Sequence, residues 1–281
     1  MTTAFLNGQF LPLDEARVSP MDRAYLFGDA VYEVIPAYNG KIFSIQEHLA
    51  RLNRSLSAIK LVSPYAEHEL HSILQQLIDR NGGGDQSIYL QISRGPAPVR
   101  EHTFPEKIQP TTFAYSMPIT WQKIEDLAKG ISAITYPDNR WENCFIKSTN
   151  LLGNILARQT AIEAGAQEAI LIRDGNAIEG SSSNLFFVYN NQLLTPPADV
   201  HILGGVTRDF IIKLAKHNQI DVVEKNVPQE LIWQANEIWI SSSGREIVPV
   251  LKVNDKIIGD GVAGPLWQKM ITLYREFRNK I

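Results

Sequence analysis

Cysteine is almost absent from this chain of 281 residues, because Cys144 is the only one. A single cysteine excludes an intrachain disulfide framework and a cluster of thiolate metal ligands within one chain, and we expect no metal. Long apolar runs are missing too, since no stretch approaches the ~18 to 20 apolar residues that span a bilayer. The N-terminus lacks a basic segment followed by an apolar core, the pattern of a secretion signal. We therefore expect a cytoplasmic protein without a membrane partner.

Charge of one sign is not in excess either. Lys+Arg 27 against Asp+Glu 30 gives a formal net charge of -3, which leaves no electrostatic footprint for nucleic acid. The chain also has no internal repeat and no G-x-G-x-x-G at a strand-to-helix junction, so a repeat architecture and a dinucleotide-binding fold have little support. A hydrophobic content of 44% indicates a globular protein with one large or two medium domains.

Hydrophobic periodicity predicts two successive α/β units. The first helix covers residues 44–61 and begins with a capping box of Ser44 and Glu47. The second covers residues 66–80 and ends at a run of glycines. Further helices are expected at 150–164, 207–217 and 265–279, strands at 87–95, 111–120, 130–137, 168–180, 183–197, 221–227, 237–243 and 246–261, and hairpin turns at Asp174-Gly175 and Asn190-Asn191. We predict a smaller N-terminal domain, 1–118, and a larger C-terminal domain, 119–281.

Lys147 lies among small and apolar neighbours immediately before a predicted helix. A lysine that loses hydration has a lowered pKa, and its neutral amine can attack a carbonyl to form a Schiff base. A lysine that reaches solvent, or pairs with Asp138 or Glu142, is the alternative. We expect Lys147 to face the same interior as the apolar side of the following helix, which consists of Leu151, Leu152, Ile155, Leu156 and Ile162.

A second candidate is Glu179, at the end of a predicted strand and directly before Gly180 and three serines. Hydroxyls and backbone N–H groups are thus concentrated beside one carboxylate. If that carboxylate is buried, it needs a cationic or protonated partner. The alternative is a polar hairpin with a solvated glutamate.

Three further stretches are candidate anion sites. Gly204 and Gly205 precede Val206 and Thr207 at the start of a predicted helix, where free N–H groups and the helix dipole attract anions; the alternative is a tight turn with Thr207 as the cap. The sequence SSSGRE, 241–246, is another hydroxyl-rich strand end. The loop RGPAPVREHTFP carries Arg100 and His102, of which the arginine can bind a carboxylate bidentately; a solvated pair is the alternative.

These candidates together match the requirements of pyridoxal 5'-phosphate. Its aldehyde needs a lysine, its pyridine nitrogen needs an anion to stay protonated, and its phosphate needs a cradle of N–H groups and hydroxyls. One cofactor would use them all.

Seven stretches in one order strengthen that hypothesis: DRAYLFGDAVYEV, EHLARL, RGPAPVREHTFPE, IKSTNLLGNILARQTA, EAILIRDGNAIEGSSSNLFFV, GGVTRD and EIVPVLKVNDKIIGDG. The chain resembles, nearly end to end, a fold-type IV (class IV) pyridoxal-phosphate aminotransferase, closest to the bacterial D-amino-acid transaminases. The resemblance implies an α+β fold of two α/β-type domains with the active site between them.

The resemblance also implies roles for individual residues. Lys147 would form the Schiff base with the cofactor and move the substrate proton, while Glu179 would pair with the pyridine nitrogen. Tyr32, Arg100 and His102 would hold the substrate α-carboxylate, the last two from the neighbouring subunit, so that a homodimer is implied. The remaining contacts to the cofactor and its phosphate would come from Arg51, Ser181, Ser182, Ser183, Val206, Thr207, Ser242 and Ser243.

The implied reaction moves an amino group between a D-amino acid such as D-alanine and 2-oxoglutarate or pyruvate, with ping-pong kinetics. Branched-chain L-amino-acid transaminases, (R)-amine transaminases and aminodeoxychorismate lyases share the cofactor site and differ in the carboxylate clamp. The Arg-x-His pair of VREHTFP favours D-amino acids. Ser243-Gly244 replaces two threonines that relatives tend to carry, and Val206 an isoleucine, so side-chain preference can differ.

Overall fold

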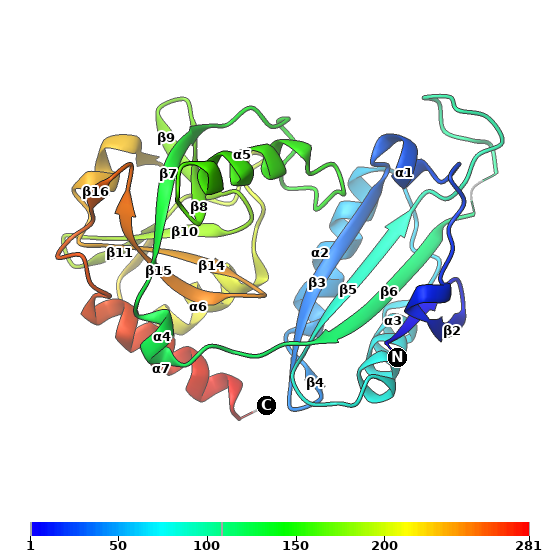
Figure 1. The fold of residues 1–281 in the computed structure, drawn as a ribbon, viewed down its shortest axis with the longest axis horizontal. Coiled ribbons are helices and arrows are strands. Elements are labelled where there is room, and N and C mark those ends of the chain that lie inside the picture. The colour runs from blue at the N-terminus through cyan, green and yellow to red at the C-terminus, as the bar shows by residue number, and fades with distance from the viewer. Residues whose placement is uncertain (1, 108, 281) are drawn as a thin grey trace. The chain divides into compact units, whose positions relative to one another are not determined.

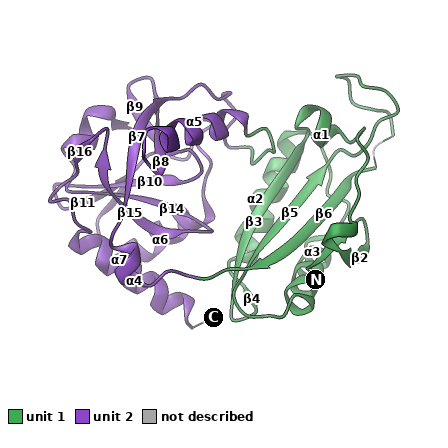
Figure 2. Ribbon diagram, viewed as in Figure 1, with its two compact units in different colours: residues 1–120, 146–151, 281 green, residues 121–145, 152–280 purple. Residues whose placement is uncertain are grey.

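The computed structural model describes residues 2–107 and 109–280. Its contacts divide the chain into two compact units (Figure 2). The first contains the chain up to Thr120 together with Ile146–Leu151, and the second contains Trp121–Phe145 and Leu152–Lys280. The short segment that carries Lys147 therefore belongs to the first unit, although the residues on both sides of it belong to the second.

The first unit is built on a six-stranded sheet in the order β2-β1-β6-β5-β3-β4, with every neighbouring pair antiparallel. Two helices, α2 and α3, lie along one face of this sheet (Figure 1). The elements are β1 (Thr3–Leu6), β2 (Gln9–Pro12), the short helix η1 (Leu13–Glu15), α1 (Arg23–Phe27), β3 (Ala30–Tyr38), β4 (Lys41–Ile42), α2 (Ile45–Ala58), α3 (Glu67–Arg80), β5 (Gln86–Ser93) and β6 (Thr111–Pro118).

The two helices predicted here are confirmed, because their apolar residues recur on one face and reach the core of the unit. Leu49, Leu52 and Leu56 of α2 are buried against sheet residues such as Ile35. The predicted capping box is wrong. Ser44 adopts φ 49° and ψ 40°, a left-handed conformation, and its side chain makes no cap hydrogen bond, whereas an N-cap serine acts from the β region.

The second unit contains a ten-stranded sheet, mostly in the order β12-β11-β10-β14-β15-β7-β8-β9-β13. An additional pairing of β9 with β10, between Glu179 and Asn184, joins strands from distant parts of this order. The elements are α4 (Ile124–Leu127), β7 (Ile131–Pro137), α5 (Leu152–Glu163), β8 (Glu168–Arg173), β9 (Asn176–Gly180), β10 (Asn184–Tyr189), β11 (Gln192–Thr195), α6 (Val206–His217), β12 (Val222–Glu224), β13 (Val227–Pro228), η2 (Gln229–Trp233), β14 (Glu237–Ser242), β15 (Glu246–Val253), β16 (Lys256–Ile257) and α7 (Pro265–Arg278).

The strands, helices and hairpin turns predicted for this region are confirmed. Both predicted turns have positive φ at their two central residues, 48° and 73° at Asp174-Gly175 and 50° and 60° at Asn190-Asn191, as a type I′ hairpin requires. Alternate residues of β8 enter two cores: Ile170 belongs to the large core to which α6 and α7 also contribute, and Ala169 and Leu171 belong to the core that contains the buried alanines of α5. The strand is therefore buried on both faces.

One expectation about α5 is wrong. The helix uses small residues, Ala157 and Ala161, to pack against β8. Leu152 and Ile155 are 65% and 59% exposed in the single chain, and Leu156 and Ile162 are exposed as well. The apolar stripe thus lies opposite the buried alanines, because hydrophobic periodicity marks a face that avoids water but not the neighbour that covers it.

Gly95 fixes the base of the loop between β5 and β6, which carries Arg100 and His102. Its φ of +85° lies in the left-handed region, and a Cβ there would overlap the carbonyl oxygen of Gln109. The carboxylate of Asp22 accepts hydrogen bonds from Ser93 Oγ at 3.0 Å and Thr111 Oγ1 at 2.7 Å. The loop therefore starts and ends at fixed points.

Gly95→Ala tests this constraint against a matched glycine. Gly82 also has a positive φ, +95°, but no atom lies within 4 Å of a Cβ built on it. We expect Gly82→Ala to cost ~1–2 kcal/mol from backbone strain alone, and Gly95→Ala to cost about 1–3 kcal/mol more because of the overlap. Chemical unfolding of both variants measures the difference, and equal losses would contradict it.

Candidate active site

The backbone on both sides of Lys147 runs beside β3. Tyr32 N–H donates to the carbonyl oxygen of Lys147 at 2.9 Å, and Thr149 N–H donates to Ala30 O at 3.0 Å. On the other side, Lys147 N–H donates to the buried Ser55 Oγ at 3.1 Å. These bonds explain why the segment belongs to the first unit, and they fix the point from which the lysine side chain starts.

The side chain of Lys147 is half-buried, and its ammonium lies 4.2 Å from the centre of the Tyr32 ring. That distance is typical of a cation–π contact. The structure thus brings together two predicted site residues, the proposed Schiff-base lysine and the proposed carboxylate-binding tyrosine. Asp138, one possible partner of Lys147, instead binds Arg140 and Arg173.

Arg51, predicted to contact phosphate, is buried in a charged cluster with Glu33 and His48. Its Nε donates to Glu33 Oε1 at 2.8 Å and its Nη2 to Glu33 Oε2 at 2.7 Å, a bidentate pair. Burial raises the pKa of Glu33, but the attraction and hydrogen bonds of Arg51 outweigh it and lower that pKa to about 2. Glu33 is thus ionised at neutral pH and fixes the guanidinium. Sequence reasoning missed Glu33 and His48, whose only signal was their place in DAVYEV and EHLARL.

His48 adds an acceptor to this cluster. Its Nδ1 lies 2.8 Å from Glu33 Oε2, so Nδ1 carries the proton and donates. Burial lowers the pKa of His48; Glu33 opposes this effect, and the nearby cations Arg51 and Lys147 add to it. The imidazole is therefore neutral. Within the described part of the chain, its buried Nε2 has no hydrogen-bond partner.

Arg100 and His102 lie together on Phe27 of α1. The guanidinium carbon of Arg100 is 4.8 Å from the ring centre, and the His102 ring is 5.4 Å from it. Both side chains are exposed in the single chain. In the single chain the two side chains thus correspond to the solvated alternative, and their predicted binding of a carboxylate stays a prediction.

The loop is anchored by two arginines that sequence reasoning missed, Arg23 through the loop backbone and Arg94 through the ring of Phe104. Arg23 donates to the carbonyl oxygens of Glu101 at 2.6 Å and of His102 at 3.3 Å, and its Nε donates to Asp29. Arg94 also binds Asp29 and lies 3.6 Å from the centre of the Phe104 ring. The pattern DRAYLFGD contains Arg23 and Asp29, but nothing local in it indicates a contact with residues about 80 positions later.

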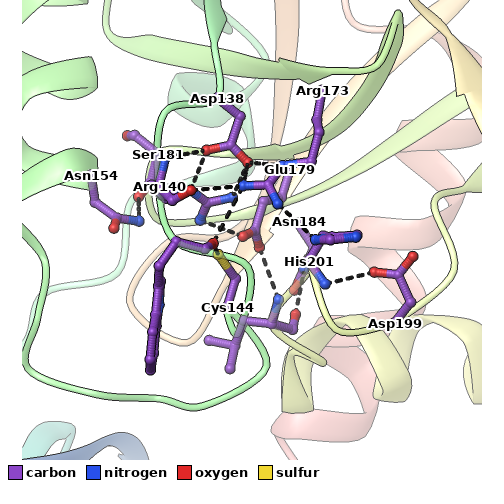
Figure 3. Close-up of polar contacts among 12 residues, drawn as sticks. Asp138, Arg140, Cys144, Asn154, Arg173, Glu179, Ser181, Asn184, Asp199 and His201 are labelled. Atoms are coloured by element: carbon purple, nitrogen blue, oxygen red, sulfur yellow. Dashed lines mark hydrogen bonds and ion pairs between the residues drawn. The ribbon is translucent and has the colours of Figure 1, made fainter.

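Glu179 is the end of a buried chain of alternating charges (Figure 3). Arg140 Nη1 donates to Glu179 Oε1 at 2.6 Å, and Arg140 Nε donates to Asp138 Oδ1 at 2.8 Å. Asp138 also accepts from Arg173 Nε at 3.0 Å, and Arg173 Nη1 lies 2.7 Å from His201 Nδ1. The alternative of a solvated glutamate is thus wrong, and the required cationic partner is Arg140.

Burial raises the pKa of Glu179 to about 7, although Arg140 and the backbone N–H of Leu203 act in the opposite direction. The Leu203 N–H donates to Oε2 at 3.2 Å. The carboxyl group is therefore near its protonation midpoint at neutral pH, and a second cation beside it would favour the anion. Cys144 lies nearby but is inert as a nucleophile, because burial raises the pKa of its thiol to about 11.

The serines after Glu179 surround a second buried carboxylate, Glu168. Ser181 donates to Glu168 Oε1 through both its backbone N–H, at 3.1 Å, and its hydroxyl, and Ser183 Oγ donates to Oε2 at 3.1 Å. Ser182 is exposed. Two of the three predicted cofactor-lining hydroxyls are thus oriented by Glu168, which sequence reasoning missed because it lies 13 residues before Ser181.

The helix expected at the predicted anion site is present as α6, which begins at Val206. Gly205, not Thr207, is the N-cap, and it provides no side-chain cap hydrogen bond. The first N–H groups of a helix have no partner within the helix, and here these include the N–H groups of Val206 and Thr207. Asn184 Nδ2 donates to Leu203 O at 2.8 Å, which ties that loop to β10.

Within the second unit, contacts through Leu203 and Asn184 link several of the predicted site residues. The loop before Val206 contacts Glu179 through Leu203. Asn184 pairs with Ser241, next to Ser242 at the end of β14. Ser243 follows in the turn, half-buried.

Comparison with known proteins gives the family. Residues 30–253 match the family model described as amino-transferase class IV. The D-alanine aminotransferase of Bacillus licheniformis is 42% identical over 267 residues, 95% of this chain and 93% of the relative. Among solved structures, the branched-chain amino acid aminotransferase of Escherichia coli has a TM-score of 0.93 with 28% identity, over 98% of this chain and 94% of the other. That of Thermobaculum terrenum in its PLP form has a TM-score of 0.88 with 25% identity, over 99% and 94%.

The chain belongs to the class IV aminotransferases, and it has their fold-type IV architecture. The predicted fold class and enzyme class are thereby confirmed. Class IV aminotransferases use pyridoxal 5'-phosphate, which confirms the predicted cofactor.

The residues of this chain fit the chemistry of pyridoxal 5'-phosphate. The buried Glu179 can accept a ring N–H, and the uncapped start of α6 can accept a phosphate. Lys147 carries an amine, the group that the aldehyde of such a cofactor would need.

The raised pKa of Glu179 has a measurable effect on stability. The folded protein keeps this proton up to about pH 7, whereas the ordinary pKa of a glutamate is 4.5. The contribution of Glu179 to the free energy of unfolding is thus fully present below pH ~4.5 and is lost as the pH rises through about 7. Between pH 4.5 and 8, Glu179→Gln should gain up to about 3 kcal/mol in unfolding free energy relative to the wild type.

Unfolding of cofactor-free protein at several pH values measures this difference. Glu125→Gln, on the exposed side of α4, is the control and should keep a constant offset from the wild type. A pH-independent difference for Glu179→Gln as well would show that burial does not hold the proton.

Proposed function

We propose that this aminotransferase acts on D-amino acids, exchanging the amino group of a substrate such as D-alanine with 2-oxoglutarate or pyruvate. The observation that carries the proposal is the 42% identity over 95% of the chain to a protein named D-alanine aminotransferase. The branched-chain enzymes that share the fold are 28% and 25% identical. Shared folds host many specificities, so the sequence match has the greater weight for substrate class.

Lys147 is the proposed attachment point and proton carrier. The cofactor supplies an aldehyde and an electron-accepting ring. Lys147 would hold the cofactor through its amine, and the same amine would accept the proton from the substrate Cα and give it back. The contact with Tyr32 and the backbone bonds to β3 support this role, because they hold the amine in one place.

Glu179 is the proposed partner of the ring nitrogen. Arg140 occupies Oε1, while Oε2 has only the longer bond from Leu203 N–H at 3.2 Å. Oε2 is thus the better acceptor for a ring N–H. The remaining predicted contacts are proposed to surround the cofactor and its phosphate: Arg51, Ser181, Ser182, Ser183, Val206, Thr207, Ser242 and Ser243.

We further propose a homodimer in which Tyr32 of one subunit and Arg100 and His102 of the other hold the substrate α-carboxylate. Two features support it. The loop with Arg100 and His102 is anchored but exposes both side chains. The apolar face of α5 is exposed in the single chain, and its isoleucines and leucines suit a surface that a second copy covers.

The second candidate is a branched-chain L-amino-acid transaminase, which the fold match at a TM-score of 0.93 favours. It would use the same cofactor site with a different carboxylate clamp.

A cytoplasmic location stays a prediction. Among the described residues, no helix has the length and apolar character that a membrane span requires.

A half-reaction tests the substrate class. We expect the purified protein to absorb in the visible region and to convert to the pyridoxamine form with D-alanine but not with L-leucine. Conversion by L-leucine alone would overturn the proposal in favour of the second candidate.

Lys147→Ala should lose both the visible absorption band and nearly all turnover, because the amine is removed. Retention of both would exclude Lys147 as the attachment point.

A mixing experiment tests the shared carboxylate clamp. Lys147→Ala and Arg100→Ala subunits should each be defective alone, while a mixed dimer regains one intact site if Arg100 acts across the interface. Random exchange then gives about a quarter of the wild-type sites, because half of the dimers are mixed and each has one such site. Turnover of D-alanine after denaturation and joint refolding measures it. No gain on mixing would place Arg100 in its own subunit's site or outside any site.

A further inference from the structure

The loop between β11 and α6, residues 196–205, connects two parts of the proposed cofactor site. Within it, the backbone N–H of Leu203 donates to Glu179 Oε2 at 3.2 Å. The loop then ends at Gly205, the N-cap of α6. Its conformation therefore determines where the Leu203 N–H and the first residue of the helix, Val206, lie.

His201 is a side chain that links this loop to the charged residues around Glu179. Its Nδ1 lies 2.7 Å from Arg173 Nη1. An arginine has donors but no acceptor, so Nδ1 accepts this hydrogen bond and the ring N–H of the neutral imidazole is on Nε2. The backbone N–H of His201 also donates to Asp199 Oδ1 at 2.8 Å. Both the backbone and the side chain of His201 are thus held by hydrogen bonds.

Arg173, the partner of His201, is itself closely held. Its Nε donates to Asp138 Oδ2 at 3.0 Å, and its Nη2 donates to Arg140 O at 3.0 Å. With His201 accepting from Nη1, each nitrogen of the guanidinium has an acceptor in the protein. The side chain of Arg173 is only 13% exposed. A donor left without a partner in such a place is costly, so His201 and Arg173 constrain each other.

These hydrogen bonds close into a ring, most of which Figure 3 shows. The ring leaves one carboxylate, passes through alternating charges to an imidazole, follows the loop backbone and returns to the same carboxylate. Its members, in order, are Glu179, Arg140, Asp138, Arg173, His201, Ile202 and Leu203. Glu179 takes part with both oxygens. Loss of one hydrogen bond in a closed ring therefore loosens the hold on both.

We propose that His201 is a positioning residue for the cofactor. By accepting the hydrogen bond of Arg173, it fixes the loop that brings the Leu203 N–H to Glu179 and leads into α6. The inference rests on the proposed function, because it takes Glu179 and the first N–H groups of α6 as cofactor contacts. A loop that is already ordered spares cofactor binding the entropic cost of ordering it. His201 thus acts on cofactor affinity through Arg173 and the loop backbone.

The affinity of the cofactor-free chain for pyridoxal phosphate, measured by absorption titration, is the main test. His201→Phe keeps a planar ring but removes the acceptor. It should raise the Kd roughly tenfold, the size expected when a hydrogen bond to a charged group is lost. The variant should fold, because the adjacent Ile202 is 2% exposed and anchors the loop in the core that contains the alanines of α5. A Kd equal to that of the wild type would overturn the proposal.

His201→Asn distinguishes the hydrogen bond from simple packing. Its side-chain oxygen can take the place of Nδ1 as the acceptor for Arg173, so its Kd should stay within about threefold of the wild type. Equal losses of affinity in His201→Asn and His201→Phe would contradict the role of the acceptor. His217→Phe is the matched control, since His217 is exposed at the other end of α6, and it should leave the Kd unchanged.

The reaction with D-alanine separates this proposal from that of the substrate class. If wild-type protein fails to react with D-alanine while His201→Phe binds pyridoxal phosphate weakly and His201→Asn binds it well, the D-amino-acid proposal alone is wrong. If D-alanine reacts and His201→Phe binds the cofactor as tightly as the wild type, the positioning role of His201 alone is wrong.

Discussion

Buried carboxylates that need cations organise both units of this protein. Glu33, Glu168 and Glu179 have almost no contact with water, and each is held by arginine. Removing one partner from such a pair leaves an uncompensated charge, which typically costs ~3–5 kcal/mol. The positions of the arginines are therefore strongly constrained. Four of the proposed cofactor contacts belong to these pairs or bind their carboxylates: Arg51, Glu179, Ser181 and Ser183.

The pairs of Glu33 and Glu179 differ in a way that suits different tasks. Glu33 holds Arg51 through two hydrogen bonds and has a pKa lowered to about 2, so its charge is fixed at neutral pH. Glu179 has one short bond from Arg140 and a pKa raised to about 7. The first pair maintains a permanent cation, as the proposed phosphate contact of Arg51 would require. The second is suited to responding when a protonated ring nitrogen arrives.

Local patterns predicted much of the fold. The helices of residues 45–58 and 67–80 and the hairpin at Asp174-Gly175 were correct, because periodicity and turn chemistry act over a few residues. The apolar stripe of α5 was placed on the wrong side, since periodicity cannot identify the neighbour that covers it. Strand β3, which supports Lys147 and carries Tyr32, was not predicted, because it is buried along most of its length and shows little alternation.

For the site, sequence reasoning found residues but not their partners. Lys147 and Glu179 were recognisable from their neighbours, yet Arg140 and Glu33 were not, because pairing across 39 or 18 residues is a tertiary property.

The burial of Cys144 close to Lys147 has a practical consequence for following the motion of this segment. Its thiol is buried, bonded to Trp141 O at 3.0 Å and three residues from Lys147. Since no other cysteine competes, the rate of its alkylation reports how often the segment before Lys147 opens, and a bound cofactor that tethers Lys147 would slow that rate.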